Sequence, residues 1–84
     1  MAKELFYYTA NWCTPCQTLG PIMDTVARQI PVHKQNIDYV NPDVLQAANV
    51  RSVPTVILVE NGQEIKRFTG IKSNSQIITW LNER

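Results

Sequence analysis

Short apolar runs and one helical stripe alternate along the first half of the chain. Residues 5–8 (LFYY) are apolar and aromatic, which predicts a β-strand. Apolar residues then recur with the spacing of an amphipathic helix, at Leu19, Ile22, Met23, Val26 and Ile30. Pro21 lies inside this stripe and predicts a kink, and Pro31 ends the predicted helix. Residues 32–37 (VHKQNI) are of mixed polarity, which predicts a strand at a sheet edge.

The middle of the chain predicts a second helix and a hairpin. Residues 41–43 (NPD) supply an N-cap, a proline at the first helical position and an acid in the first turn, so we expect a short helix through about residue 48. Residues 56–59 (VILV) form a continuous apolar run, which is typical of a strand buried on both faces. Residues 61–62 (NG) are the dipeptide favoured in tight hairpin turns. The strand at residues 64–69 is therefore expected to return antiparallel.

The C-terminal part of the chain predicts an edge strand and a last helix. Lys66 and Arg67 suit a strand that is exposed at the edge of a sheet. Ser73 and Gln76 have the spacing of a capping box, which starts a helix. The buried face of that helix is expected to consist of Ile77, Ile78, Trp80 and Leu81. Strands that are separated by helices are expected to pair in parallel, and the hairpin adds an antiparallel pair. We therefore predict an α/β fold of order β-α-β-α-β-β-α, with a four-stranded mixed sheet flanked by three helices.

Composition and length describe one small folded domain. The chain has 84 residues, of which 44% are apolar and 18% are charged, so we expect a single domain over residues 1–84. A net charge of +1 favours neither nucleic acid nor a membrane as a partner. The longest apolar run is far too short to span a bilayer, and the first residues lack the apolar stretch of a secretory signal. We therefore expect a cytoplasmic protein that acts as a monomer.

The chain has two cysteines, and both lie in the stretch WCTPCQ at residues 12–17. This stretch joins the predicted strand at residues 5–8 to the predicted helix, so Cys13 would lie at the helix N-terminus. Unpaired backbone N–H groups and the helix dipole favour a thiolate there. Cys16 lies one turn further on, close enough to form a disulfide, and is expected to be the more buried. The pattern predicts a redox pair in which Cys13 attacks and Cys16 resolves.

Two other interpretations of the cysteine pair are weaker. A structural disulfide is rare in a reducing cytosol, and so short a loop would barely constrain the unfolded chain. A zinc site needs four ligands, usually including a second pair of Cys or His residues. The chain offers only His33 on a predicted edge strand, where a lone histidine is typically a solvated or hydrogen-bonded surface residue. We therefore expect no metal site within a single chain.

The motifs around the cysteines resemble those of the thioredoxin family. WCTPC at residues 12–16 resembles the active-site signature of the family, and Pro21 stands where members kink their first long helix. The segment VRSVPTVILVENG at residues 50–62 resembles the stretch in which a cis-proline faces the redox cysteines, before the central strand and hairpin. The likeness extends from about Leu5 to Leu81. It implies a thioredoxin fold and a thiol–disulfide oxidoreductase that reduces the disulfides of partner proteins.

The resemblance also implies how substrates and electrons reach the cysteine pair. The bond between Val53 and Pro54 would be cis, and Gly70 would match the glycine that lines the substrate groove. An apolar docking surface would consist of Trp12, Val53, Pro54, Gly70 and Ile71. There the backbone before Pro54 can pair with an extended substrate segment like an added strand. The redox-active disulfide needs no bound cofactor, but an external electron donor of the thioredoxin-reductase type must reduce it again.

The chain departs from the family pattern in its length and at the site. Typical members carry a further strand and helix before the first strand, so this chain is closer in size to the glutaredoxins. Gln17 stands where a lysine usually follows the second cysteine. Tyr7 replaces a buried acid that is thought to take the proton from the second cysteine, and a phenol is a poor base at neutral pH. Lys34 matches the lysine that normally pairs with that acid, so Tyr7 and Lys34 are candidate supporting residues.

Two functional alternatives stay open. One is a redoxin that is linked to glutathione or dedicated to ribonucleotide reductase. Against the glutathione link, residues 69–73 (TGIKS) lack the Gly-Gly and acidic cluster that holds glutathione in glutaredoxins. The other is a non-catalytic binding module on a thioredoxin scaffold, although the retention of both cysteines argues against it.

Overall fold

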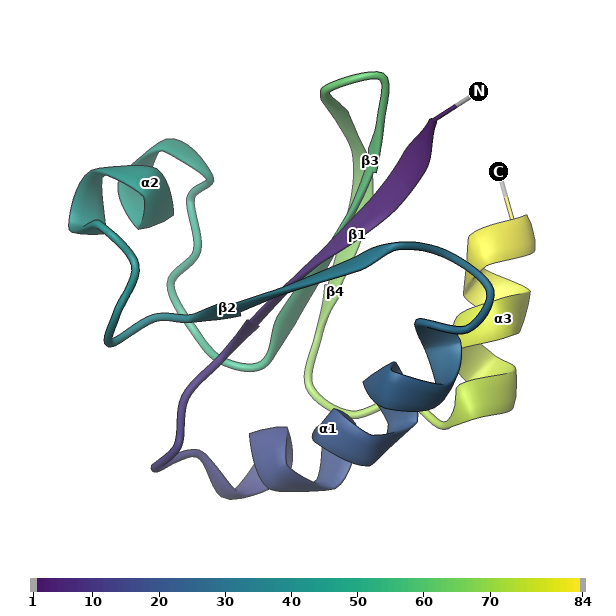
Figure 1. Cartoon of the computed structure of the whole chain (residues 1–84), viewed down its shortest axis with the longest axis horizontal. Coiled ribbons are helices and arrows are strands. Elements are labelled where there is room, and N and C mark those ends of the chain that lie inside the picture. Colours follow the sequence, from purple (N-terminus) through teal and green to yellow (C-terminus); the bar gives the residue numbers. More distant parts are fainter. Residues whose placement is uncertain (1, 84) are drawn as a thin grey trace.

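The helices and strands follow each other in the order that the sequence predicts. A computed structural model describes residues 2–83. Along the chain the elements are β1 (Lys3–Thr9), α1 (Thr14–Val26), β2 (Val32–Asn36), α2 (Pro42–Ala47), β3 (Thr55–Glu60), β4 (Gln63–Thr69) and α3 (Asn74–Asn82) (Figure 1). The predicted fold class, a mixed four-stranded sheet with three helices, is confirmed. No helix in the described part of the chain is long and apolar enough to cross a lipid bilayer.

The sheet has the strand order β2-β1-β3-β4, so β1 and β3 are central and β2 and β4 are the edges. β1 pairs in parallel with β2 and antiparallel with β3, and β4 runs antiparallel to β3. Asn61 and Gly62 form the turn between β3 and β4, with φ angles of 54° and 83°. A tight hairpin turn with two positive φ angles favours the Asn-Gly dipeptide, which explains why this turn could be predicted.

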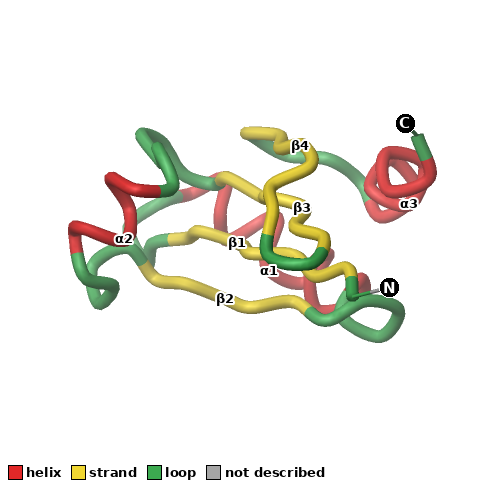
Figure 2. The backbone as a smooth tube through the Cα atoms, turned by 90° about the horizontal axis from the view of Figure 1, so that it is seen from above, coloured by secondary structure: helices red, strands yellow, loops and turns green. Residues whose placement is uncertain are grey.

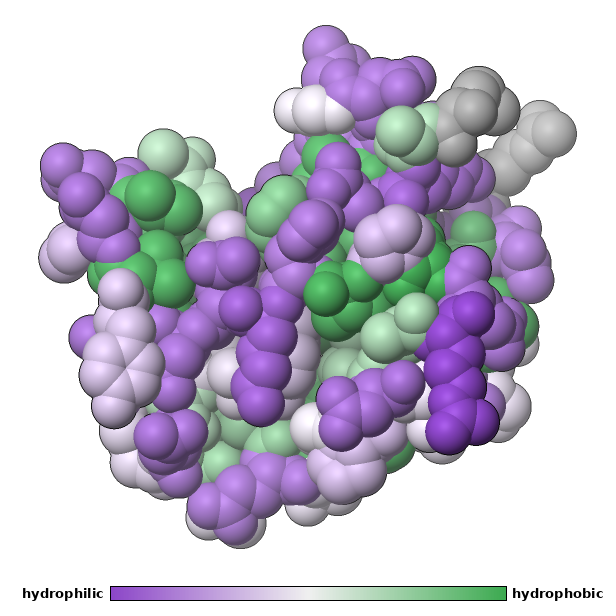
Figure 3. Space-filling view, viewed as in Figure 1, coloured by the Kyte–Doolittle hydropathy of each residue, from purple (hydrophilic) through white to green (hydrophobic). Residues whose placement is uncertain are grey.

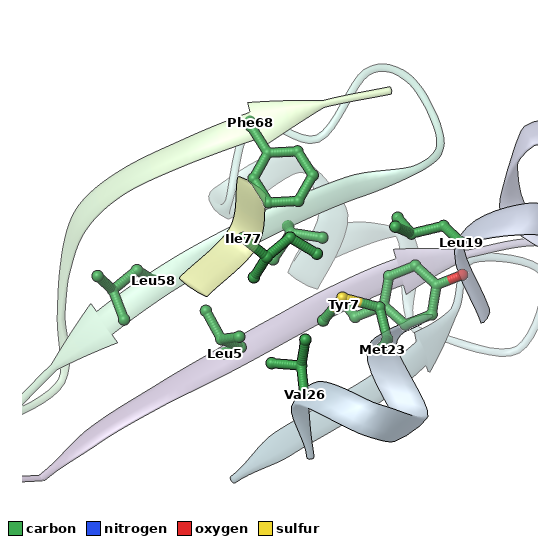
Figure 4. Close-up of a cluster of buried hydrophobic side chains, with 9 residues drawn as sticks. Leu5, Tyr7, Leu19, Met23, Val26, Leu58, Phe68 and Ile77 are labelled. Atoms are coloured by element: carbon green, nitrogen blue, oxygen red, sulfur yellow. The ribbon is translucent and has the colours of Figure 1, made fainter. Parts of the chain in front are cut away.

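α1 and α3 cover one face of the sheet, and α2 lies apart from them at one end of the molecule (Figures 1 and 2). Alternate residues of β1 and β3 point to the covered face and meet the two helices in the hydrophobic core. The core consists of Leu5, Tyr7, Leu19, Met23, Val26, Val56, Leu58, Phe68 and Ile77 (Figure 4). This packing fixes α1, which carries the cysteines, against the end of β1.

The short helix α2 buries no side chain. Apolar atoms remain on the surface here, which Figure 3 shows as a green patch over the position of α2, and Val44 is 47% exposed. The helix begins as predicted, because the Asn41 side chain accepts a hydrogen bond of 2.8 Å from the N–H of Asp43. The hydrophobic core therefore does not hold α2 in place.

α1 ends at Val26, although the apolar stripe in the sequence continues to Ile30. After the helix the N–H of Gln29 bonds to the carbonyl of Val26, in a tighter turn. Pro31 contributes to this early end, because a proline disfavours a helical conformation at the residue before it. The predicted boundary was wrong by about one helical turn.

α3 begins at the predicted capping box. The hydroxyl of Ser73 accepts a bond of 3.2 Å from the N–H of Gln76, and the side chain of Gln76 accepts one of 2.8 Å from the N–H of Ser73. Of the predicted apolar face only Ile77 is fully buried. Trp80 is half-buried and packs edge-on against Phe68, with 5.0 Å between the ring centroids. α3 is therefore attached to the core through the fully buried Ile77 and the partly buried Trp80 and Leu81.

The beginning of β1 and the end of α3 lie on the same side of the molecule. In both views they are at the right-hand end, whereas α2 and the turn from β1 into α1 lie toward the left (Figures 1 and 2). The cysteines at the start of α1 are thus far from both of these points.

Candidate active site

The turn between β1 and α1 places Cys13 at the N-cap of α1. Cys13 has an extended backbone, with φ −95° and ψ 110°, and Thr14 and Pro15 begin the helix. The Sγ of Cys13 accepts a hydrogen bond of 3.2 Å from the backbone N–H of Cys16. A proline suits the first turn because its missing N–H would have had no helical partner. The sulfur of Cys13 therefore lies where the free N–H groups of a helix favour negative charge.

Cys13 and Cys16 form a disulfide, and their Cα atoms are 5.2 Å apart. Both residues are buried, with 5% of Cys13 and 3% of Cys16 exposed, so the predicted difference in burial is small. Ala10, Ile37 and Val53 pack around the pair and cover it. The two cysteines differ instead in their helical positions, because Cys13 caps α1 and Cys16 lies inside its first turn.

Val53 and Pro54 lie beside the disulfide. The carbonyl oxygen of Val53 is 3.6 Å from the Sγ of Cys13, and the Val53–Pro54 peptide bond is cis, as the family resemblance implies. Gly70 has a φ of 83°, which favours glycine, and its N–H donates to the carbonyl of Pro54 at 3.1 Å. The fold thus brings the cysteine pair, the cis-proline and this glycine together from three separate parts of the chain.

Trp12, which precedes Cys13, and Ile71, which follows Gly70, are large apolar residues that stay exposed, by 65% and 49%. The indole N–H of Trp12 donates to the carboxylate of Asp38 at 3.0 Å, which holds the exposed ring in one orientation. Sequence patterns did not reveal this role of Asp38. It lies 26 residues from Trp12, and no local spacing connects the two.

A hollow of about 120 Å³ separates Trp12 from the loop that follows α2. Besides Trp12 it is lined by Ile37, Leu45, Val50, Arg51, Ser52 and Val53. The lining is mostly apolar and reaches Val53, whose carbonyl lies next to Cys13. An extended segment beside Cys13 would therefore find room here for one apolar side chain.

Tyr7 is buried close to the cysteine pair, on the side of the core. Its hydroxyl lies 3.1 Å from the backbone carbonyl oxygen of Cys16 and 3.2 Å from the hydroxyl of Thr9. A carbonyl can only accept, so Tyr7 donates its single proton to Cys16, and Thr9 can in turn donate to Tyr7. Tyr7 is therefore bound to the backbone of Cys16 rather than to its sulfur.

Lys34 of β2 is the register neighbour of Tyr7 on β1. Both residues border a hollow of about 360 Å³, which also reaches Cys16, Gln17 and Asp24. A polar hollow of this size can hold water. The structure thus brings the two candidate supporting residues and Cys16 to one hollow on the core side of the disulfide.

We expect Tyr7→Phe to change the rate of disulfide reduction only modestly. The change removes a hydrogen bond to the backbone of Cys16, which contributes ~0.5–1.5 kcal/mol to stability, and leaves both sulfurs in place. Tyr7→Asp should instead alter the pH dependence of the rate, because it puts a carboxyl group beneath Cys16. Rates measured across the neutral pH range test both. A loss of more than about tenfold in Tyr7→Phe, equal to ~1.4 kcal/mol, with folding intact would make the hydroxyl a participant in catalysis.

His33 is engaged away from the cysteines. Its ring lies 2.6 Å from a carboxylate oxygen of Glu4 and stacks on Phe6, with 4.7 Å between the ring centroids. It is thus the hydrogen-bonded surface residue that the sequence predicts. Among residues 2–83, no group of three or more His, Cys, Asp or Glu side chains is placed to hold a metal ion.

Known proteins match this chain over most of its length. A family model described as Thioredoxin matches residues 2–83. The thioredoxin of Rickettsia bellii is 34% identical over 79 residues, which cover 89% of this chain and 74% of that protein. The thioredoxin of Chlamydia trachomatis is 32% identical over 82 residues, which cover 94% and 79%. Among solved structures, a mutant thioredoxin from Halobacterium salinarum has a TM-score of 0.86 and 31% identity, over 93% of this chain and 70% of that one.

The geometry and the comparisons agree on the chemistry of the site. A disulfide at a helix N-terminus can take up two electrons, and the resulting dithiol can pass them to a disulfide of another protein. Both cysteines and the cis-proline lie where the family resemblance implies. The chain belongs to the thioredoxin family, and its Cys13–Cys16 pair makes it a thiol–disulfide oxidoreductase that acts as a protein-disulfide reductase.

Proposed function

We propose that Cys13 is the attacking thiolate and Cys16 the resolving cysteine in the reduction of partner disulfides. The Cys13 thiolate attacks one sulfur of the partner disulfide, which forms a mixed disulfide and releases the other partner sulfur as a thiolate that takes up a proton. Cys16 then loses its proton and attacks the sulfur of Cys13. This step releases the second partner thiolate, closes the Cys13–Cys16 disulfide and completes the transfer of two electrons to the partner.

One contact carries this assignment of roles. The sulfur of Cys13 accepts the backbone N–H of Cys16 at 3.2 Å, at the N-cap of α1. A thiolate at Cys13 keeps this hydrogen bond and gains the favourable field of the helix N-terminus. Cys16 supplies the N–H from inside the first turn, so its own sulfur does not receive the same stabilisation.

The partner disulfide would dock on the surface around Cys13. This docking surface consists of Trp12, Val53, Pro54, Gly70 and Ile71. The exposure of the two large side chains, 65% for Trp12 and 49% for Ile71, supports such a role. An extended partner segment could add to the backbone at Val53 as a strand, which places its cysteine beside Cys13.

An external reductase of the thioredoxin-reductase type would reduce the Cys13–Cys16 disulfide after each cycle. One relative supports this electron donor. It is described as a bifunctional thioredoxin reductase/thioredoxin, from Mycobacterium leprae, and is 32% identical over 90% of this chain and 17% of that protein. The protein would act in the cytoplasm as a single-domain monomer and without a bound cofactor. Its net charge of +1 supports protein partners rather than nucleic acid or membranes.

Insulin reduction tests this proposal directly. We expect the protein to reduce insulin repeatedly when NADPH and a thioredoxin reductase are supplied, and we expect the double variant Cys13→Ser/Cys16→Ser to be inactive. Glutathione with glutathione reductase should not sustain the reaction. Turnover with glutathione alone would favour the glutathione-linked alternative. Full activity of the double variant in the cell would favour a binding module.

A further inference from the structure

The loop of residues 49–54 connects α2 to β3 and forms one wall of the hollow beside Trp12. Four residues of this loop line the hollow: Val50, Arg51, Ser52 and Val53. The helix before the loop buries no side chain. Apolar packing holds this wall only at its end, where Val53 packs against the cysteine pair, so polar contacts have to hold the beginning of the loop.

Arg67 of β4 holds the beginning of this loop. Its guanidinium donates to the carbonyl oxygen of Ala48 at 2.7 Å and to that of Asn49 at 3.1 Å. These carbonyls lie at the C-terminal end of α2, where a helix leaves them without backbone partners. A cation at this end also interacts favourably with the helix dipole. Asn49 has a φ of 57°, so the chain leaves the helix at the point that Arg67 binds.

Glu64 fixes the orientation of the Arg67 guanidinium. Its two carboxylate oxygens accept from Nε at 2.7 Å and from Nη2 at 2.6 Å. Such a pair of parallel hydrogen bonds restricts the orientation of the guanidinium plane. The hydrogen bond from Arg67 lowers the pKa of the Glu64 carboxyl, against a smaller opposing effect of burial. Glu64 thus stays ionised at neutral pH and keeps Arg67 in place.

β4 also holds the other end of the loop. The N–H of Gly70, which directly follows β4, donates to the carbonyl of Pro54 at 3.1 Å. Between these two attachments lies Val53, whose carbonyl is 3.6 Å from the Sγ of Cys13. β4 therefore holds both ends of the loop, at Arg67 and at Gly70, while Val53 packs against the disulfide between them.

We infer that Arg67, oriented by Glu64, is a positioning residue for substrate docking. It holds the loop of residues 49–54 so that the hollow beside Trp12 can take up an apolar side chain next to the reactive cysteine of the substrate. The inference rests on the proposed function, in which a partner segment docks beside Cys13. Arg67 acts through the loop, since its hydrogen bonds go to Glu64 and to the backbone of Ala48 and Asn49, where the chain leaves α2. Small disulfides without flanking residues do not use the hollow, so their reduction should not depend on Arg67.

Steady-state kinetics of Arg67→Met test this inference with two substrates. With insulin we expect the KM to rise about three- to tenfold, because the freed loop has to be ordered on binding, while kcat stays close to that of the wild type. With bis(2-hydroxyethyl) disulfide, which has no peptide flanks, the rate should be unchanged. A role in general stability alone would affect both substrates alike or neither.

Lys66→Met is the matched control. Lys66 is the neighbour of Arg67 on β4 and likewise donates to backbone carbonyls at a helix end, those of Trp80 and Glu83 at the end of α3. It lies against α3 rather than α2, so its loss should leave the KM for insulin unchanged. Amide hydrogen exchange should be faster at residues 44–53 in Arg67→Met and unchanged there in Lys66→Met.

Glu64→Gln covers the case in which Arg67→Met does not fold. It keeps the arginine but weakens its orientation, so the KM for insulin should rise in the same direction by a smaller factor. The inference would be overturned if Arg67→Met and Glu64→Gln both kept the wild-type KM for insulin, or if they lost activity equally with insulin and with the small disulfide. Either result would leave the proposed function standing. A wild-type protein that does not reduce insulin would overturn the proposed function, and this inference with it.

Discussion

We expect the Cys13→Ser protein to reduce protein disulfides no faster than the uncatalysed exchange. A serine hydroxyl is not ionised at neutral pH and cannot form a mixed disulfide, so the first step fails. Cys16→Ser should carry out this first step and then stop, because no second thiolate is present to release the partner. The two variants should thus fail at different points of one reaction.

Mass spectrometry under non-reducing conditions separates these two outcomes. The Cys16→Ser protein should be recovered as a covalent adduct with its partner, and this adduct identifies the partner in a cell extract. Rates of alkylation of the reduced wild type test the assignment further, because Cys13 at the helix N-cap should react much faster than Cys16. The two cysteines are almost equally buried in the disulfide. A large difference between their alkylation rates would therefore reflect the effect of the helix N-terminus on the Cys13 thiolate. Equal rates, or an adduct on Cys16 in the Cys13→Ser protein, would contradict the proposed roles.

Replacing Ile77 by alanine should cause a large loss of stability. Ile77 is the one fully buried residue of α3 and is 0% exposed. Removing a buried aliphatic side chain and leaving a cavity costs ~2–5 kcal/mol. Small domains are stabilised by only ~0.05–0.15 kcal/mol per residue, so this loss is a large share of the total. Urea unfolding followed by circular dichroism measures it.

Ile65→Ala is the control for this prediction. Ile65 has the same side chain but is 51% exposed on β4, so little apolar surface leaves water when the protein folds around it. Its replacement should cost less than about 1 kcal/mol. Similar losses in both variants would show that Ile77 does not anchor α3 to the core.

The sequence predicted most of the fold because the relevant signals are local. The apolar runs and stripes give the strands and helices, and residues 61–62 and the capping box at Ser73 specify a turn and a helix start from adjacent positions. The order of helices and strands then restricts the sheet to few topologies. The end of α1 was missed because the apolar stripe continues to Ile30, which packs against the core from outside the helix.

The contacts that shape the candidate site could not be predicted, because they join distant parts of the chain. Val53 covers the disulfide from 40 residues after Cys13, which makes the predicted difference in burial between the cysteines small. Arg67 was expected only as a charge on an exposed edge, whereas in the structure it bonds to Asn49 and Ala48, which are 18 and 19 residues away in the sequence. No recurring spacing in the sequence signals either contact. Both depend on which side chains the folded sheet brings together.

The distance of the start of β1 and the end of α3 from the disulfide favours genetic fusion of this domain to another protein. A domain joined before β1 or after α3 would leave the docking surface accessible, since both points lie at the opposite end of the molecule. A linker as long as the longest dimension of the molecule, 30 Å, would let a fused reductase reach across to the disulfide. About nine extended residues cover this length at ~3.3–3.6 Å each, and a flexible linker needs more. With such a linker the reductase would meet the disulfide at a high effective concentration, independent of the amount of protein in solution.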